Sequence, residues 1–173
     1  MSKLARRMRT VWVAALILSL SACSSYIQSR GPTLPQDARW AVAVPDNLTS
    51  AMNADLLLQQ MLGTALAQRD ITAKPYPNAV RVYQAPSLAS AIGWARSNGI
   101  QYVVASTIGE WGYRGNGKGG PAIGVTLVVI RAADQQVLWQ ASGARSDWAG
   151  RGLDVTALKV AKKLVDDIPL QRR

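Results

Sequence analysis

The stretch AIGVTLVVIR at residues 122–131 decides the fold of this chain, because a run this rich in valine and isoleucine is typical of a buried β-strand. A second run, VLWQASGAR at residues 137–145, follows the turn at residues 132–135 and is expected to pair with the first. A third β-rich run, at residues 101–111, precedes both. Together the three runs predict an antiparallel meander.

Upstream of the meander, strand and helix patterns alternate. Residues 39–44 (RWAVAV) predict a first strand, and an apolar stripe over residues 58–66 predicts the helix that follows it. Residues 79–83 (AVRVY) predict a second strand, and Ser87 is expected to cap a helix over residues 88–97. Helices between successive strands imply crossover connections, so the early strands are expected to pair in parallel.

A final amphipathic helix is expected over residues 154–167. The element order is therefore β-α-β-α-β-β-β-α, which predicts an α+β or α/β fold with a mixed sheet of about five strands in a two-layer or three-layer sandwich. In the last helix the pattern turns four apolar residues inward and three cations outward: Leu158, Ala161, Val165 and Ile168, and Lys159, Lys162 and Lys163.

The first 22 residues have the order of a secretion signal. Four cations and no acid precede the apolar run 11–20, which at about ten residues is too short to span a bilayer. The sequence LSAC at residues 20–23 then resembles a lipobox, where cleavage leaves an acylated cysteine as the first residue. We expect a covalent lipid on Cys23 and, because Ser24 rather than an aspartate follows, an outer-membrane location facing the periplasm.

Composition favours a single domain without a catalytic role. Residues 23–37 contain glycine and prolines among polar residues and predict a lipidated tether, which leaves residues 38–173 as one periplasmic domain. Removal of the signal leaves 16 cations and 10 acids, a net charge of +6, which fits an anionic membrane surface better than nucleic acid. The chain has no histidine, which is the commonest general base. Its one cysteine is the residue expected to carry the lipid, so no thiol nucleophile is left. We expect no enzyme activity, no metal and no cofactor beyond the lipid.

Two loops carry the remaining signals. The segment GYRGNGKGG at residues 112–120 lacks the Ser or Thr and the helix that a phosphate-binding loop requires, so it is either a flexible hairpin tip or a loop that lines a pore or touches a subunit. The segment RSDWAGR at residues 145–151 places Trp148 between Arg145 and Arg151. Trp148 is either a core residue or, as an amphipathic ring beside cations, a membrane contact.

Several motifs carry a family resemblance. The acidic turn and "VLW" strand within residues 130–142 resemble lipoproteins related to the curli secretion protein CsgG and to the N-terminal domain of TolB. More narrowly, the segments ARWAV (38–42), GPAIGV (120–125) and LWQASGARS (138–146), with Trp148, resemble the PelC family of Pel exopolysaccharide export systems.

The PelC resemblance implies a role in export. It implies a ring of twelve subunits beneath a PelB-like outer-membrane β-barrel exporter, which guides a cationic polysaccharide to the pore. It also implies a membrane-facing tryptophan, with the neighbouring cations Arg145, Arg151, Lys159, Lys162 and Lys163 on the same face, and an acidic lumen for which Glu110, Asp134 and Asp147 are the candidates. The alternative is a binding module that activates or scaffolds an envelope enzyme or secretion complex, although a tether this short has little reach.

Overall fold

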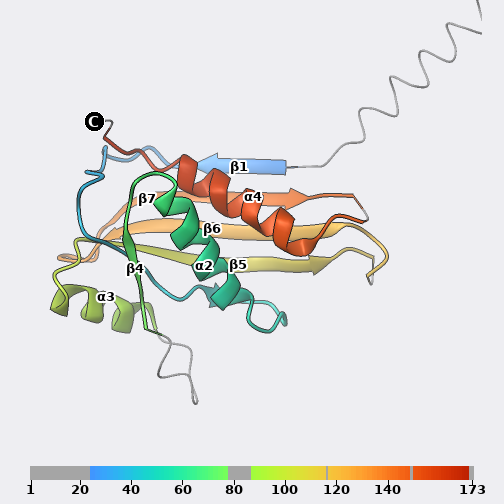
Figure 1. The fold of residues 1–173 in the computed structure, drawn as a ribbon, viewed down its shortest axis with the longest axis horizontal. Coiled ribbons are helices and arrows are strands. Elements are labelled where there is room, and N and C mark those ends of the chain that lie inside the picture. Colours follow the sequence, from blue (N-terminus) through green and yellow to red (C-terminus); the bar gives the residue numbers. More distant parts are fainter. Residues whose placement is uncertain (1–23, 78–86, 116, 149, 172–173) are drawn as a thin grey trace, which may run out of the picture.

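A seven-stranded mixed sheet forms the centre of the molecule (Figure 1). The computed structural model describes residues 24–77, 87–115, 117–148 and 150–171. The path through the sheet is β1-β7-β6-β5-β2-β4, and β3 pairs with β5 beyond the end of β2. The strands are β1 (Ser24–Gln28), β2 (Trp40–Val42), β3 (Asp46–Asn47), β4 (Ala73–Pro75), β5 (Tyr102–Tyr113), β6 (Pro121–Arg131) and β7 (Val137–Ser146).

The pairing follows the order expected from the sequence. Strands β5, β6 and β7 form the antiparallel meander, and β2 runs parallel to both β5 and β4. The predicted strand at residues 79–83 lies outside the described residues, and β4 takes the parallel position beside β2. The prediction of about five strands was too low. Strands β1 and β3 are held by backbone pairing, and their sequences lack the alternation of apolar and polar residues by which a strand is recognised.

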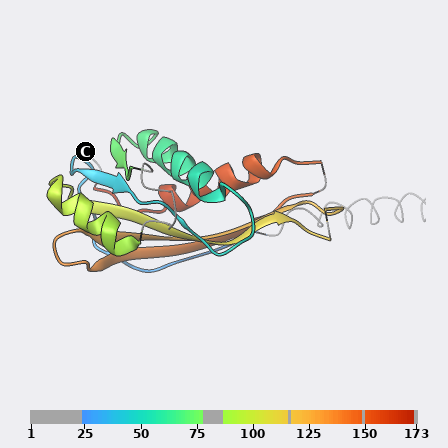
Figure 2. The same ribbon diagram turned by 90° about the horizontal axis from the view of Figure 1, so that it is seen from below.

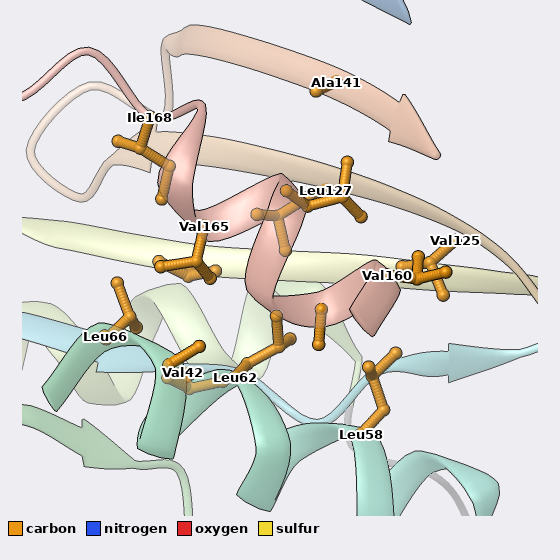
Figure 3. Packing of buried hydrophobic residues seen from close by; sticks show 14 of the residues in the cluster. Val42, Leu58, Leu62, Leu66, Val125, Leu127, Ala141, Val160, Val165 and Ile168 are labelled. Carbon is orange, nitrogen blue, oxygen red and sulfur yellow. The ribbon is translucent and has the colours of Figure 1, made fainter. Parts of the chain in front are cut away.

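The helices divide the core between the two faces of the sheet. Helices α2 (Ala54–Ala67) and α4 (Leu153–Asp166) pack side by side on one face, and α3 (Leu88–Ser97) covers one end of the other (Figures 1 and 2). Successive strand residues point to opposite faces, so Val104 joins the cluster beneath α2 and α4, whereas Val103 joins the cluster beneath α3. Figure 3 shows side chains of α2 and α4 meeting above the sheet.

The structure confirms three of the four residues that were predicted to point inward from the last helix. Ala161, Val165 and Ile168 are buried, as expected. Leu158 is 44% exposed, so the prediction that it points inward was wrong. The buried stripe of α4 centres on Ala157, Val160 and Leu164, and Leu158 lies at its margin.

The predicted tether is part of the folded domain. Strand β1 pairs antiparallel with β7, and Leu34, which follows it, is 2% exposed in the main core cluster. Tyr26 of β1 lies over Gly143, where a Cβ atom would come within 2.6 Å of the tyrosine ring. Residues 24–37 therefore do not form a free linker, and the described chain is part of the fold from Ser24 onward.

Candidate membrane-contact site

Two loops meet at one end of the sheet. The β5–β6 hairpin and the connection from β7 to α4 lie at the same end (Figure 1), and the Asp147 amide donates a hydrogen bond of 3.0 Å to the Pro121 carbonyl. Gly120 is required here, because a Cβ atom at this position would overlap the backbone carbonyl of Asp147. We call this end, formed by residues 113–115, 117–120, 147–148 and 150–152, the tip.

Trp148 is the most prominent side chain of the tip. It is 67% exposed, so the interpretation of Trp148 as a core residue was wrong for this chain. Tyr113, at the end of β5, is 48% exposed, and Arg114 and Lys118 of the same hairpin are also exposed. Aromatic rings beside cations are the combination that a bilayer interface selects. These hairpin residues could not be assigned to the site from the sequence, because only the backbone contact between the two loops brings the hairpin to the same end of the sheet as Trp148.

The first described residue of the chain, Ser24, lies at the tip as well. In the register of β1 with β7, Ser24 is the partner of Arg145, three residues before Trp148. Cys23 immediately precedes Ser24 in the chain, so a lipid on Cys23 is attached within one residue of the folded sheet at this end. An anchor held this closely would bring the tip, rather than a broad face of the domain, to the membrane.

Asp147 organises the base of the tip. Its side chain is 5% exposed and accepts hydrogen bonds of 3.0 Å from both Arg145 and Thr156, while Lys159 Nζ lies 3.5 Å away. Burial by itself would raise the pKa of Asp147, but the hydrogen bonds from Arg145 and Thr156 and the charges of Arg145 and Lys159 outweigh it and hold the pKa below its ordinary value. Asp147 therefore stays ionised and fixes the β7–α4 connection.

The predicted cations do not form one free basic face. Arg145 and Lys159 share Asp147, Lys162 pairs with Asp166 at 3.2 Å, and Lys163 pairs with Asp167. Lys162 also lies roughly 14 Å along α4 from its first residue, at the rise of an α-helix, and so away from Trp148. Of the predicted set, Arg145 and Arg151 flank Trp148 in the chain and Lys159 reaches the tip through Asp147, whereas Lys162 and Lys163 belong to the far half of α4.

The three predicted polymer-guiding acids are not brought together. Glu110 is exposed near the tip end of β5. Asp134 lies in the β6–β7 turn at the opposite end of the sheet, where hydrogen bonds from Arg131 and then from the Gln136 amide lower its pKa. Asp147 is buried and neutralised by its partners, which argues against a polymer-guiding role for it. Among the described residues, no group of three histidine, cysteine or acidic side chains is placed to hold a metal ion.

The fold belongs to a class found in lipoproteins. No protein-family model matches the chain, and no curated protein matches it. Among solved structures, the lipoprotein GNA1162 from Neisseria meningitidis has the same fold with a TM-score of 0.51 and 14% identity, over 75% of this chain and 99% of that one. Within the described part of the chain, no helix is long and apolar enough to cross a membrane.

The particular likeness is to PelC. The PelC dodecamer from Paraburkholderia phytofirmans matches with a TM-score of 0.75 and 25% identity, over 87% of this chain and the whole of that one. A substituted form of the same PelC, also a dodecamer, matches with a TM-score of 0.74. The chain therefore has a PelC-like fold.

Proposed function

We propose that this chain is an outer-membrane lipoprotein that assembles into a ring of twelve subunits and guides an exopolysaccharide to a β-barrel exporter. The observation that carries the proposal is the match to PelC dodecamers, which covers their entire solved chain. The lipobox ending at Cys23 and the position of Ser24 at the tip support attachment to the membrane by a lipid at this end. The role is structural, without catalysis, metal or cofactor.

In this proposal the tip rests on the periplasmic surface of the outer membrane. Trp148 and Tyr113 lie at the level of the headgroups, and Arg114, Lys118 and Arg151 contact anionic groups there. Because β1 leaves the anchor almost no free length, the domain has little reach away from the membrane. Short reach favours a component fixed beneath an exporter over an activator that must reach an enzyme across the periplasm.

The mass of the intact lipoprotein tests the ring. The full lipidated protein is extracted in detergent, and the mass of the assembly is measured by native mass spectrometry over a range of concentrations. We expect one discrete species near twelve subunits. A species that is monomeric at every concentration would overturn the proposed ring.

Polymer binding tests the guiding role separately. The probes are chitosan oligomers, which are cationic, and N-acetylated chitin oligomers of the same length, which are neutral. We expect the protein to bind chitosan more tightly, with affinity that falls as salt is added. Glu110→Gln and Asp134→Asn, which each remove an exposed carboxylate, should weaken chitosan binding. Equal affinity for the two polymers would contradict the guiding role.

A further inference from the structure

Helix α2 is unusual among surface helices because its outward face carries no charge. Its exposed residues are Leu57, Gln60, Thr64 and Ala67, and its one charged residue, Asp55, is 8% exposed. Leu57 is itself 45% exposed. A surface helix normally presents charged and polar side chains to water. The outward face of α2 therefore lacks the charges of an ordinary surface helix, and among the described residues no other element buries it.

The opposite side of the molecule has a second uncharged surface. Helix α3 covers only one end of that sheet face (Figure 2). Beyond it, residues of β1, β5, β6 and β7 line an open hollow. Two large apolar side chains flank the hollow, Ile27 of β1 at 76% exposed and Leu48 after β3 at 69%. Small or hydroxyl residues line it: Ser25, Thr107, Gly109, Gly124, Thr126, Ser142 and Ala144. We call this surface the open sheet face, and Glu110 borders it at the tip end.

These two surfaces are chemically matched, because neither carries a charge. The mature chain carries 16 cations and 10 acids, yet neither the outward face of α2 nor the hollow contains any of them. The outward face of α4, by contrast, carries Lys159, Lys162 and Asp166. Packing a helix against a sheet is the usual way to bury an uncharged face of each. The small residues of the hollow allow such a helix to approach the strands closely.

We infer that the outward face of α2 in one copy of this chain docks onto the open sheet face of the next copy. This inference rests on the proposed ring and names the surfaces that build it. A closed ring needs a head-to-tail interface in which two different patches of each subunit meet. The two uncharged faces lie on opposite sides of the sheet, so each copy can bind one neighbour through each face. The same contact then repeats around the ring.

The position of the tip agrees with this arrangement. The strands of the meander end at the tip, so with the tip on the membrane they rise away from its surface. Both uncharged faces then stand upright and meet neighbours around the ring. Trp148 and the lipidated end lie at the edge of these faces rather than within them, and the charged face of α4 remains in water.

Paired substitutions test the inference on the full lipidated protein. Leu57→Lys places a charge on the α2 face, and Ile27→Lys places one on the open sheet face; both side chains are already exposed, so the fold should be retained. We expect each variant to fall from twelve-subunit to single-subunit mass. Val155→Lys is the matched control, since Val155 is 41% exposed near the start of α4 on its charged face, and it should keep the wild-type mass.

Mixing the two variants gives the sharper readout. The Leu57→Lys chain keeps an intact sheet face and the Ile27→Lys chain keeps an intact α2 face, so an equal mixture should form dimers with one copy of each and nothing larger. If both variants remain rings, or if both are monomeric and the mixture gives no dimer, the assigned surfaces are wrong. A wild-type protein that forms no ring would instead overturn the proposed function and this inference with it. If circular dichroism shows either variant to be unfolded, Thr64→Lys and Ser25→Lys replace them on the same faces.

Discussion

Replacement of Asp147 by asparagine is expected to destabilise the domain strongly. The side chain is 5% exposed, and its oxygens accept three hydrogen bonds, two from Arg145 and one from Thr156, and lie near the charge of Lys159. Asp147→Asn therefore removes a buried charge but keeps the size of the group. Hydrogen bonds to a charged group contribute about 1.5–3 kcal/mol each, and breaking a buried ion pair costs about 3–5 kcal/mol. Arg145 and Lys159 can recover part of this loss in water, because their side chains are 24% and 38% exposed.

The expected loss for Asp147→Asn is therefore about 2–4 kcal/mol, a large part of the stability of an ordinary domain. For a domain of about 150 residues this corresponds to a midpoint lowered by roughly 5–15 °C. The assay is thermal unfolding of residues 24–173, followed by circular dichroism at one fixed protein concentration. The control is Asp134→Asn, whose side chain is 51% exposed in a surface pair and whose loss should leave the midpoint unchanged.

The pH dependence gives the same prediction a second test. The pKa of Asp147 is lower in the folded state than in the unfolded chain, where an aspartate titrates near pH 3.9. Its stabilisation should therefore be complete above about pH 4 and disappear as the pH falls through the folded-state pKa. The gap between wild type and Asp147→Asn should be constant near neutral pH and close under strongly acidic conditions. A midpoint for Asp147→Asn equal to that of wild type at pH 7 would refute the reasoning.

Three further predictions concern the tip and the leading segment. Trp148→Ala should leave the thermal midpoint of residues 24–173 unchanged but reduce binding to phosphatidylglycerol vesicles in a sedimentation assay; unfolding instead would return Trp148 to the core. Gly120→Ala should lower the midpoint, because its Cβ atom overlaps the Asp147 carbonyl, and a neutral result would refute the close approach. Leu34→Ala should cost about 2–5 kcal/mol in urea unfolding, whereas a loss below about 0.5 kcal/mol would restore the tether interpretation.

The meander and its neighbours could be predicted because their apolar patterns reflect burial directly. Strand β6 alternates between the two sheet faces with Ile123, Val125, Leu127 and Val129 under the helices, and the cap of α3 is formed by Ser87 as its sequence indicates. Strand β1 could not be predicted in this way. Its residues SSYIQ are mostly polar, and only the unsatisfied edge of β7 makes a strand there favourable.

The candidate site shows the same division. Sequence placed Trp148 between two arginines but left its role open, since an aromatic in a turn can pack inward or point outward. The contact between the two tip loops added Tyr113, Arg114 and Lys118, which lie about thirty residues earlier in the chain. The three predicted polymer-guiding acids do not share one surface. The sequence could not show this, because it does not reveal which cation pairs with each acid. Asp147 looks free in the sequence and is held by Arg145, Thr156 and Lys159 in the fold.

The sequence by itself determined the features that depend on local order. These are the basic and then apolar pattern of the first 22 residues, which predicts a secretion signal before Cys23, the three strands of the meander, and the amphipathic pattern of α4. Each is set by residues adjacent in the chain. Only the tertiary structure decided which distant residues share a surface. Pairing of β1 with β7 brought Ser24 to the end of the sheet that carries Trp148, and packing on one side of the sheet left α2 and the open sheet face as two uncharged surfaces. The physical reason is that burial and pairing depend on long-range contacts, which the pattern of neighbouring residues does not encode.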